Sequence, residues 1–63
     1  MAYKSYNNRK KIGDWVYTTK VHSSLSGEFE IGSYVQIIEI DDVRGYGIQD
    51  AYGNRVIEIG WEI

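Results

Sequence analysis

The 63-residue chain has room for one domain, and its net charge at pH 7 is only −2. It contains no cysteine, which excludes disulfides, thiolate zinc sites and cysteine nucleophiles. Its longest apolar run spans only residues 15–17, too short for a transmembrane segment or a signal-peptide core, so we expect a soluble, cytoplasmic protein.

The aliphatic residues favour strands over helices. Nine isoleucines and five valines stand against one leucine and two alanines, and six tyrosines and two tryptophans add to them. β-Branched and aromatic side chains suit a pleated, half-buried surface, whereas alanine and leucine are stronger helix formers. The composition therefore predicts an all-β domain.

The first eleven residues differ in charge from the rest of the chain. Four cations lie there: Lys4, Arg9, Lys10 and Lys11. Residues 12–63 carry three cations against all nine carboxylates, a net charge of −6. We interpret residues 1–11 as a flexible, solvated basic tail and residues 12–63 as the folded domain. The alternative is an arm that contacts a phosphate backbone.

The first strand is predicted at 14–20, within GDWVYTTKV. Trp15 and Tyr17 fall on one face of this strand, and Val16 and Thr18 on the other. Residues 22–32 lack sustained alternation and are predicted to form a long loop or an irregular hairpin.

His22 is the only imidazole and adjoins several serines. Neighbouring positions in the sequence do not create the geometry of a nucleophile and its base, and a small barrel has little cleft in which to desolvate one. We interpret His22 as a loop histidine in water and expect no enzymatic activity.

The second strand is predicted at 33–40, where SYVQIIEI alternates most clearly, and DDVRG at 41–45 is typical of a turn. Four carboxylates gather in sequence around this turn: Glu39, Asp41, Asp42 and Asp50. Oxygen ligands at this density suit Ca²⁺ or Mg²⁺, but the EF-hand spacing is absent. We interpret them as solvated caps and expect no metal or other cofactor.

The third strand is predicted at 45–50, where Tyr46 and Ile48 share one face. It leads into the turn DAYGN, in which Gly53 stands where a three-residue hairpin loop requires positive φ. The last two strands are expected at 54–59 and 61–63.

Five short strands, a long loop after the first and tight turns between the next three have the connectivity of an SH3-like barrel. The chain resembles small SH3-like barrels of phages and prophages of Gram-positive bacteria in three stretches: GDWV, GEFEIGSYVQI and RGYGIQDAYGNRVIEIGW. The resemblance implies a five-stranded SH3-like fold and a phage protein in the host cytoplasm, and is nearly silent on activity. SH3 domains that bind polyproline carry an ALYDY-like segment and a Pro-x-x-Tyr motif. This chain has no proline and reads HSSLSGEFE in its long loop, so polyproline binding is not expected.

The predicted core follows from the inward faces of these strands. It contains Val16, Val35, Ile37, Ile40, Ile48, either Val56 or Ile57, and Trp61. Trp15 and Phe29 are further candidates, because a domain of this size can bury only a few large rings.

Four tyrosines outside the tail are predicted to be at least partly exposed: Tyr17, Tyr34, Tyr46 and Tyr52. They form, with Asp41 and Asp42, the predicted surface for a protein partner, either a basic protein or a second copy of the chain. The plainer interpretation is that the tyrosines cover the edges of a thin barrel.

The alternative function is nucleic-acid binding, in which bases stack on the tyrosines. The cations for this alternative are Lys4, Arg9, Lys10, Lys11, Lys20, Arg44 and Arg55. The charge of −6 on residues 12–63 opposes contact with phosphate, so protein binding is the preferred hypothesis.

Overall fold

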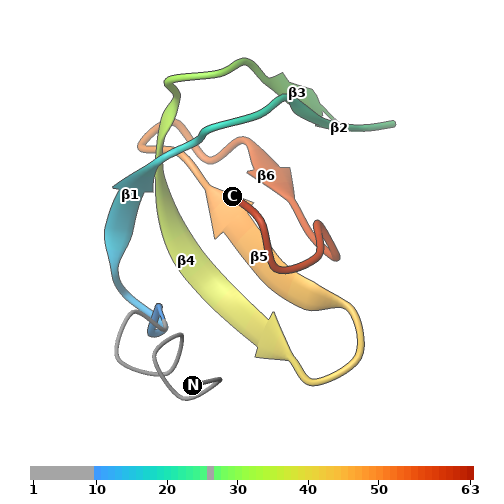
Figure 1. Ribbon diagram of the computed structural model, residues 1–63. Helices are drawn as coiled ribbons and strands as arrows, with labels where there is room; N and C mark the ends of the chain where they lie inside the picture. Colours follow the sequence, from blue (N-terminus) through green and yellow to red (C-terminus); the bar gives the residue numbers. More distant parts are fainter. Residues whose placement is uncertain (1–9, 26) are drawn as a thin grey trace.

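The computed structural model describes residues 10–25 and 27–63, and these residues form six β-strands and no helix (Figure 1). The strands are β1 (Trp15–Tyr17), β2 (His22–Ser24), β3 (Gly27–Phe29), β4 (Tyr34–Asp41), β5 (Gly45–Gln49) and β6 (Arg55–Val56). The predicted all-β class is confirmed. Within these two ranges no helix exists that could cross a membrane. Most of the predicted basic tail, residues 1–9, lies outside the described residues.

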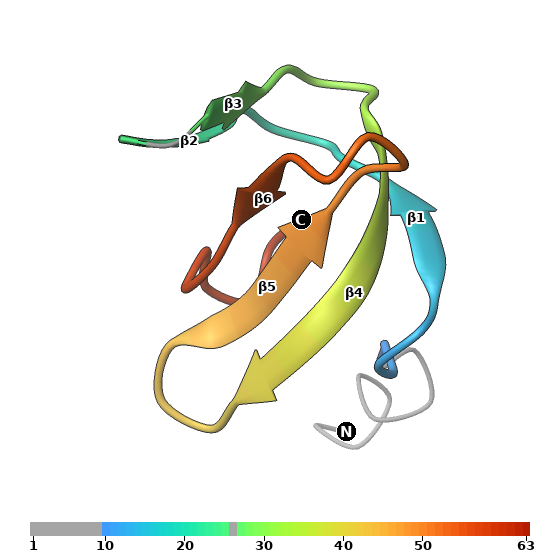
Figure 2. The same cartoon turned by 180° about the vertical axis from the view of Figure 1, so that it is seen from behind.

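Four strands form one antiparallel sheet in the order β1-β4-β5-β6, and β2 pairs with β3 in a separate hairpin. β4 is the longest strand and has β1 on one side and β5 on the other. The pairing of β4 with β5 shifts register between Ile37 and Glu39, as at a β-bulge, which bends a strand and increases its twist. Figures 1 and 2 show β4 as a long curved strand from both sides.

The segment 22–32, predicted to form a long loop or an irregular hairpin, contains the β2–β3 hairpin, whose three residue pairs are in regular antiparallel register. His22 pairs with Phe29, and both side chains are buried, because this end of the hairpin packs onto the core. Leu25, near the other end of the hairpin, is fully exposed. The hairpin thus covers the core at one end and projects into solvent at the other.

The core lies beneath the inner face of the four-stranded sheet. Its buried members are Phe29, Val35, Ile37, Tyr46, Ile48, Val56 and Ile63, with Val16, Ile40 and Ile59 packed around them. Val35, Ile37 and Ile48 are completely buried. The prediction holds for these three residues. At β6 the prediction left a choice between Val56 and Ile57, and the structure decides it: Val56 is buried and Ile57 is 47% exposed.

The C-terminal part of the chain departs from the prediction. β6 ends at Val56, and Glu58 takes a positive φ of 58°, which turns the chain out of the antiparallel ladder. Gly60 then forms a parallel bridge with Gly45. The strand expected at 61–63 does not form, and Trp61, expected in the core, is 51% exposed. The place in the core is taken by Ile63.

The first strand also ends earlier than expected, at Tyr17, and the chain bends at residues 19 and 20. The Thr18 hydroxyl is buried, donates to the Glu30 carbonyl at 2.7 Å and accepts from the Ser33 amide at 2.9 Å. These bonds hold the long loop against the end of β1.

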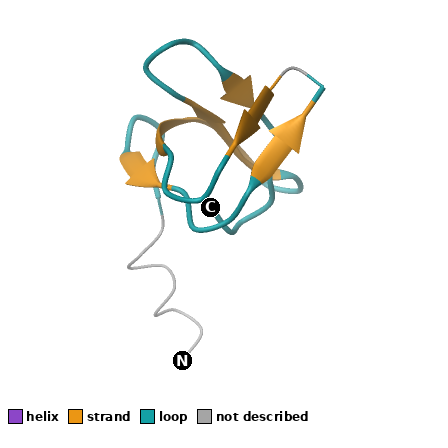
Figure 3. Ribbon diagram, turned by 90° about the horizontal axis from the view of Figure 1, so that it is seen from above, coloured by secondary structure: helices purple, strands orange, loops and turns teal. Residues whose placement is uncertain are grey.

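The two sheets are not joined into a closed barrel. The gap is bridged by the end of the chain: the Ile63 carbonyl accepts from the Thr19 amide at 2.9 Å and lies 2.6 Å from His22 Nε2. Viewed from above, the strands surround this end of the chain (Figure 3).

Candidate binding surface

The outer face of β1 and β4 carries three aromatic side chains, of which the central one, Tyr34, contacts the other two. The Trp15 and Tyr34 rings stack with centroids 5.1 Å apart, and the Tyr17 and Tyr34 rings lie 4.7 Å apart at a tilt of 37°. All three side chains are exposed: Trp15 by 40%, Tyr34 by 51% and Tyr17 by 66%. We call Trp15, Tyr17 and Tyr34 the aromatic cluster.

The pairing of the two strands places these rings together. Tyr17 lies directly opposite Tyr34, and Trp15 lies opposite Gln36, so Trp15 reaches Tyr34 along the diagonal. Opposite and diagonal neighbours are the pairs that interact on a sheet face. Alternation in WVY sends Val16 inward, as predicted, and leaves the two rings on the outer face. Trp15, a candidate for the core in the sequence analysis, is therefore outside it.

Polar side chains continue this face across the sheet. Gln36 pairs with Gln49 on β5, and Gln49 pairs with Arg55 on β6. Arg55 Nε donates to Gln49 Oε1 at 3.1 Å, and Gln36 Nε2 donates to the Gly13 carbonyl at 3.2 Å. The aromatic cluster therefore borders a row of amide and guanidinium groups on the same face.

Tyr46, predicted to be exposed, is buried at 5% and belongs to the core. Its ring meets Trp61 edge to face, with centroids 5.1 Å apart. Tyr46 is buried because it shares the inward face of β5 with Ile48, which is completely buried. That alternation was visible in the sequence and could have placed Tyr46 correctly.

Tyr52 is 89% exposed in the turn after β5. The antiparallel pairing of Gln36 with Gln49 places this turn at the same end of the sheet as Tyr34. No ring contact joins Tyr52 to another aromatic side chain within the described ranges. Tyr52 is thus a neighbour of the aromatic cluster and not a member of it.

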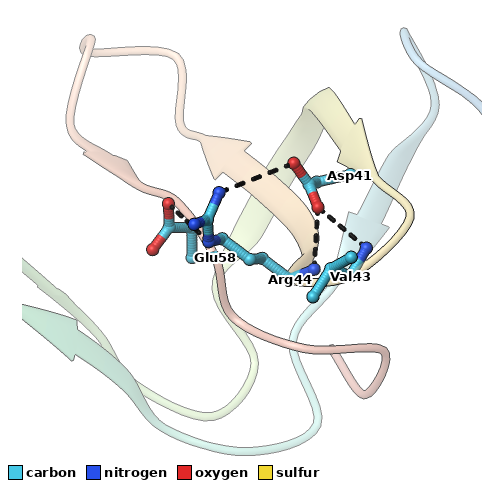
Figure 4. Close-up of polar contacts among 4 residues, drawn as sticks. All are labelled: Asp41, Val43, Arg44 and Glu58. Atoms are coloured by element: carbon cyan, nitrogen blue, oxygen red, sulfur yellow. Dashed lines mark hydrogen bonds and ion pairs between the residues drawn. The ribbon is translucent and has the colours of Figure 1, made fainter.

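Asp41 and Asp42 lie at the far end of β4 from Tyr34. Asp41 accepts from the amides of Val43 and Arg44 at 2.8 and 2.9 Å, and Arg44 also approaches Asp41 and Glu58 at 4.0 and 3.6 Å (Figure 4). The bonds from Arg44 and then Val43 keep the pKa of Asp41 below its ordinary value. Asp41 organises a turn, and neither acid flanks the tyrosines.

The cations proposed for nucleic acid are spread over the molecule. Lys4 and Arg9 lie outside the described residues. Lys10 and Lys11 precede β1, and Lys20 lies 3.5 Å from Glu62. Arg44 lies between two carboxylates, and of the described cations only Arg55 extends the row beside the aromatic cluster.

His22, interpreted from the sequence as a solvated loop histidine, is buried at 6%. Its Nε2 donates to the Ile63 carbonyl at 2.6 Å, so the imidazole ties β2 to the end of the chain. The acidic group predicted around one turn is also divided, because Asp50 lies at the opposite end of β5 from Asp41. Among the described residues, no three His, Cys, Asp or Glu side chains are placed to hold a metal ion.

An open groove of about 390 Å³ lies between the β2–β3 hairpin and β6. It is lined by Ser24, Leu25, Arg55 and Ile57, and most of its lining is apolar. Sequence reasoning missed this groove, because its walls come from segments thirty residues apart.

No family model, curated protein or solved structure matches this chain. The aromatic cluster is the feature of the described surface that most clearly departs from ordinary packing. Large apolar side chains scattered singly are normal on a protein surface, whereas rings gathered into one patch indicate an interaction site.

Proposed function

We propose that this protein is a non-catalytic binding module whose aromatic cluster docks a protein partner. The observation that carries the proposal is that three exposed rings from two strands gather on one face, with Tyr34 in contact with both Trp15 and Tyr17. Tyrosine and tryptophan combine a large apolar body with a polar tip, and protein interfaces are enriched in them. A partner that covers the cluster removes this area from water.

Charge supports a basic partner. Residues 12–63 carry −6, and Lys20 and Arg44 already lie beside carboxylates. An acidic surface speeds the encounter with a basic protein and fixes its orientation. In this proposal the rings supply most of the contact area and the net charge supplies steering. A host protein is the kind of partner that the resemblance to phage barrels implies.

The fold in this proposal is a partly open SH3-like barrel. Its support is the strand order β1-β4-β5-β6 with a long loop after β1 and tight turns between the later strands. The bond from the Thr19 amide to the Ile63 carbonyl lies where a fifth strand would close the sheet beside β1. The outer face of β1 and β4 is then on the outside of the barrel.

The absence of catalysis is part of the proposal. His22 is buried and its Nε2 is engaged by a backbone carbonyl, so it is poorly placed to act as a base on a bound substrate. In this proposal the protein is a cytoplasmic binding factor without a cofactor.

Nucleic-acid binding stays the second candidate because of one observation. Gln49 and Arg55 lie on the same face as the aromatic cluster, and amide, guanidinium and ring groups together suit a single strand with stacked bases. The net charge of residues 12–63 and the pairing of Lys20 and Arg44 oppose it.

The test compares two tyrosine variants. Tyr34→Ala removes the central ring of the cluster, whereas Tyr52→Ala removes an exposed ring that contacts no other ring among the described residues. Each immobilised variant is challenged with lysate of a Gram-positive host. We expect a protein that binds the parent and Tyr52→Ala but not Tyr34→Ala.

A parallel titration with a mixed-sequence oligonucleotide at low salt separates the two candidates, because charge is least screened there. We expect no binding. Micromolar binding that weakens steeply with salt and disappears when residues 1–11 are deleted would replace the protein-binding proposal with the nucleic-acid one.

A further inference from the structure

Within residues 10–25 and 27–63, no strand pairs with the backbone groups on the outer edge of β1. β1 is the outermost strand of its sheet and lies at the rim in both views (Figures 1 and 2). Asp14 accepts from the Ile37 amide and Thr18 donates to the Ser33 carbonyl, so even-numbered residues face β4. By alternation, Trp15 and Tyr17 turn their N–H and C=O groups away from β4.

The open edge is short and has clear limits. At one end the Thr19 amide bonds to the Ile63 carbonyl, so the end of the chain occupies the edge there. At the other end the Asp14 amide bonds to the Lys11 carbonyl, which closes a turn. Between these limits, no described segment pairs with the outer edge of β1.

A second copy of β1 complements this edge. In an antiparallel pair centred on Val16, Trp15 of each copy lies opposite Tyr17 of the other. The outward N–H and C=O groups of these two residues then exchange bonds twice, giving four backbone hydrogen bonds. Each pairing also sets an indole beside a phenol ring on the outer face, a favourable cross-strand pair.

Charge at the two ends of β1 favours the same arrangement. The end before β1 carries Lys10, Lys11 and Asp14, a net +1. The end after β1 carries Lys20, Glu62 and Glu30, a net −1. Two contacts place the acids there: Glu62 lies beside Lys20, and the Glu30 carbonyl accepts from the Thr18 hydroxyl. Antiparallel pairing brings the positive end of each copy to the negative end of the other.

We propose that two copies of this protein join through their β1 edges into one continuous eight-stranded sheet. The sheet would carry both aromatic clusters side by side on its outer face, so the dimer doubles the surface available to a partner. An exposed edge strand is a known route to pairing between chains, and here the sequence Trp-Val-Tyr makes that pairing self-complementary.

The test is sedimentation of the full chain over a concentration series. A three-residue edge is smaller than a standard interface, so the association should be weak and should appear between about 10 µM and about 1 mM. We expect the mass to rise from 7.3 kDa toward twice that value.

Two variants of one residue identify the interface. Tyr17→Pro removes an outward N–H but no bond to β4, and proline is tolerated on edge strands in that orientation. Tyr17→Ala keeps the N–H and removes the ring. We expect the dimer to be lost in Tyr17→Pro, weakened in Tyr17→Ala and unchanged in Tyr52→Ala.

Amide exchange in the unmodified protein supplies a measurement that does not depend on any variant. The amides of Trp15 and Tyr17 should exchange rapidly in dilute solution and slow at least several-fold as the concentration rises. A monomer at all concentrations, or a dimer that survives Tyr17→Pro with these amides still fast, overturns the proposal. Either result leaves the aromatic cluster as a docking site for another protein, because that function is measured separately with Tyr34→Ala.

Discussion

The two turns on either side of β5 are built from the same parts but differ in how much change they can accept. In the first, Asp41 Oδ1 accepts from the amides of Val43 and Arg44; in the second, Asp50 Oδ1 accepts from those of Tyr52 and Asn54. Each turn also contains a glycine, Gly45 or Gly53, with a φ of 91°. Judged by local conformation alone, the two turns are equivalent.

Their surroundings are different. A Cβ atom on Gly45 would lie 2.1 Å from the carbonyl oxygen of Gly60, whereas one on Gly53 would meet nothing within 4 Å. Gly45 therefore serves two purposes, since it supplies the left-handed conformation and lets a distant part of the chain approach its backbone. Gly53 supplies only the conformation. The comparison shows that equal turn signals can hide very different long-range roles.

Gly45→Ala should have the largest effect. It adds the cost of a left-handed alanine to a backbone overlap that cannot be relieved while the Tyr46 amide bonds to the Gly60 carbonyl at 3.0 Å. We expect a loss of roughly 3 to 5 kcal/mol in the free energy of unfolding, enough to unfold much of a domain this small. Urea denaturation followed by circular dichroism measures it, and a loss no greater than that of Gly53→Ala would contradict the comparison.

Ile48→Ala tests the strand that connects the two turns. Ile48 is completely buried and pairs with Ile37 and Val56. We expect a loss of about 2 to 4 kcal/mol, the usual range for a truncated core residue. Ile57→Ala is the control, since Ile57 is 47% exposed. If Ile48→Ala melts within a degree or two of the parent, the register of β5 is not as described.

Gly53→Ala should cost about 1 kcal/mol, because only the backbone conformation is disfavoured and the space beside it is open. Gly53→Asn is the matched control, since asparagine enters this conformation more easily than alanine. We expect the asparagine variant to melt above the alanine variant. A neutral or stabilising Gly53→Ala would mean that the turn adopts another geometry in solution.

Local pattern was sufficient for much of this fold. The alternation in SYVQIIEI placed Val35 and Ile37 inward, and the turn chemistry of DAYGN predicted the positive φ of Gly53. The failures came from contacts between distant segments. Nothing near Glu58 indicates positive φ, and the approach of Gly60 to Gly45 redirects the chain so that Ile63 replaces Trp61 in the core.

The candidate site was predictable to a similar degree. Alternation placed Trp15 and Tyr17 on one face of the first strand, but only the register of β1 against β4 shows that Tyr34 joins them. Asp41 and Tyr34 belong to one strand, yet the length of that strand keeps the acidic turn away from the rings. The sequence therefore predicted that the binding surface is built from tyrosines, but it did not predict correctly which residues belong to it.

Lowering the pH should reduce the stability of the fold by the smallest amount, gradually, and through both turns. The hydrogen bond from the Asn54 side chain lowers the pKa of Asp50 most; desolvation opposes it and is second in size, and the amides of Asn54, Tyr52 and Gly53 lower the pKa further. The pKa of Asp41 is lowered mainly by the Arg44 and Val43 amides, with a smaller contribution from the charge of Arg44. A carboxyl whose pKa is lower in the folded state contributes stability above its unfolded pKa of about 4, and that contribution is lost as the pH falls through the folded value.

Thermal melts between about pH 6 and pH 2 should therefore show stability falling below about pH 4, and either Asp41→Asn or Asp50→Asn should flatten that fall. The two turns should separate on addition of salt. Arg44 lies 4.0 Å from Asp41 and 60% of its side chain is exposed, so salt screens its attraction to the Asp41 carboxylate. The hydrogen-bond partners of Asp50 are neutral, so salt does not weaken their effect. We expect added salt to reduce the difference in stability between the parent and Asp41→Asn. The difference in stability between the parent and Asp50→Asn should stay the same. Equal salt dependence in the two variants would show that the charge of Arg44 does not stabilise the first turn. That turn would then be held by uncharged hydrogen-bond donors only, as the second turn is.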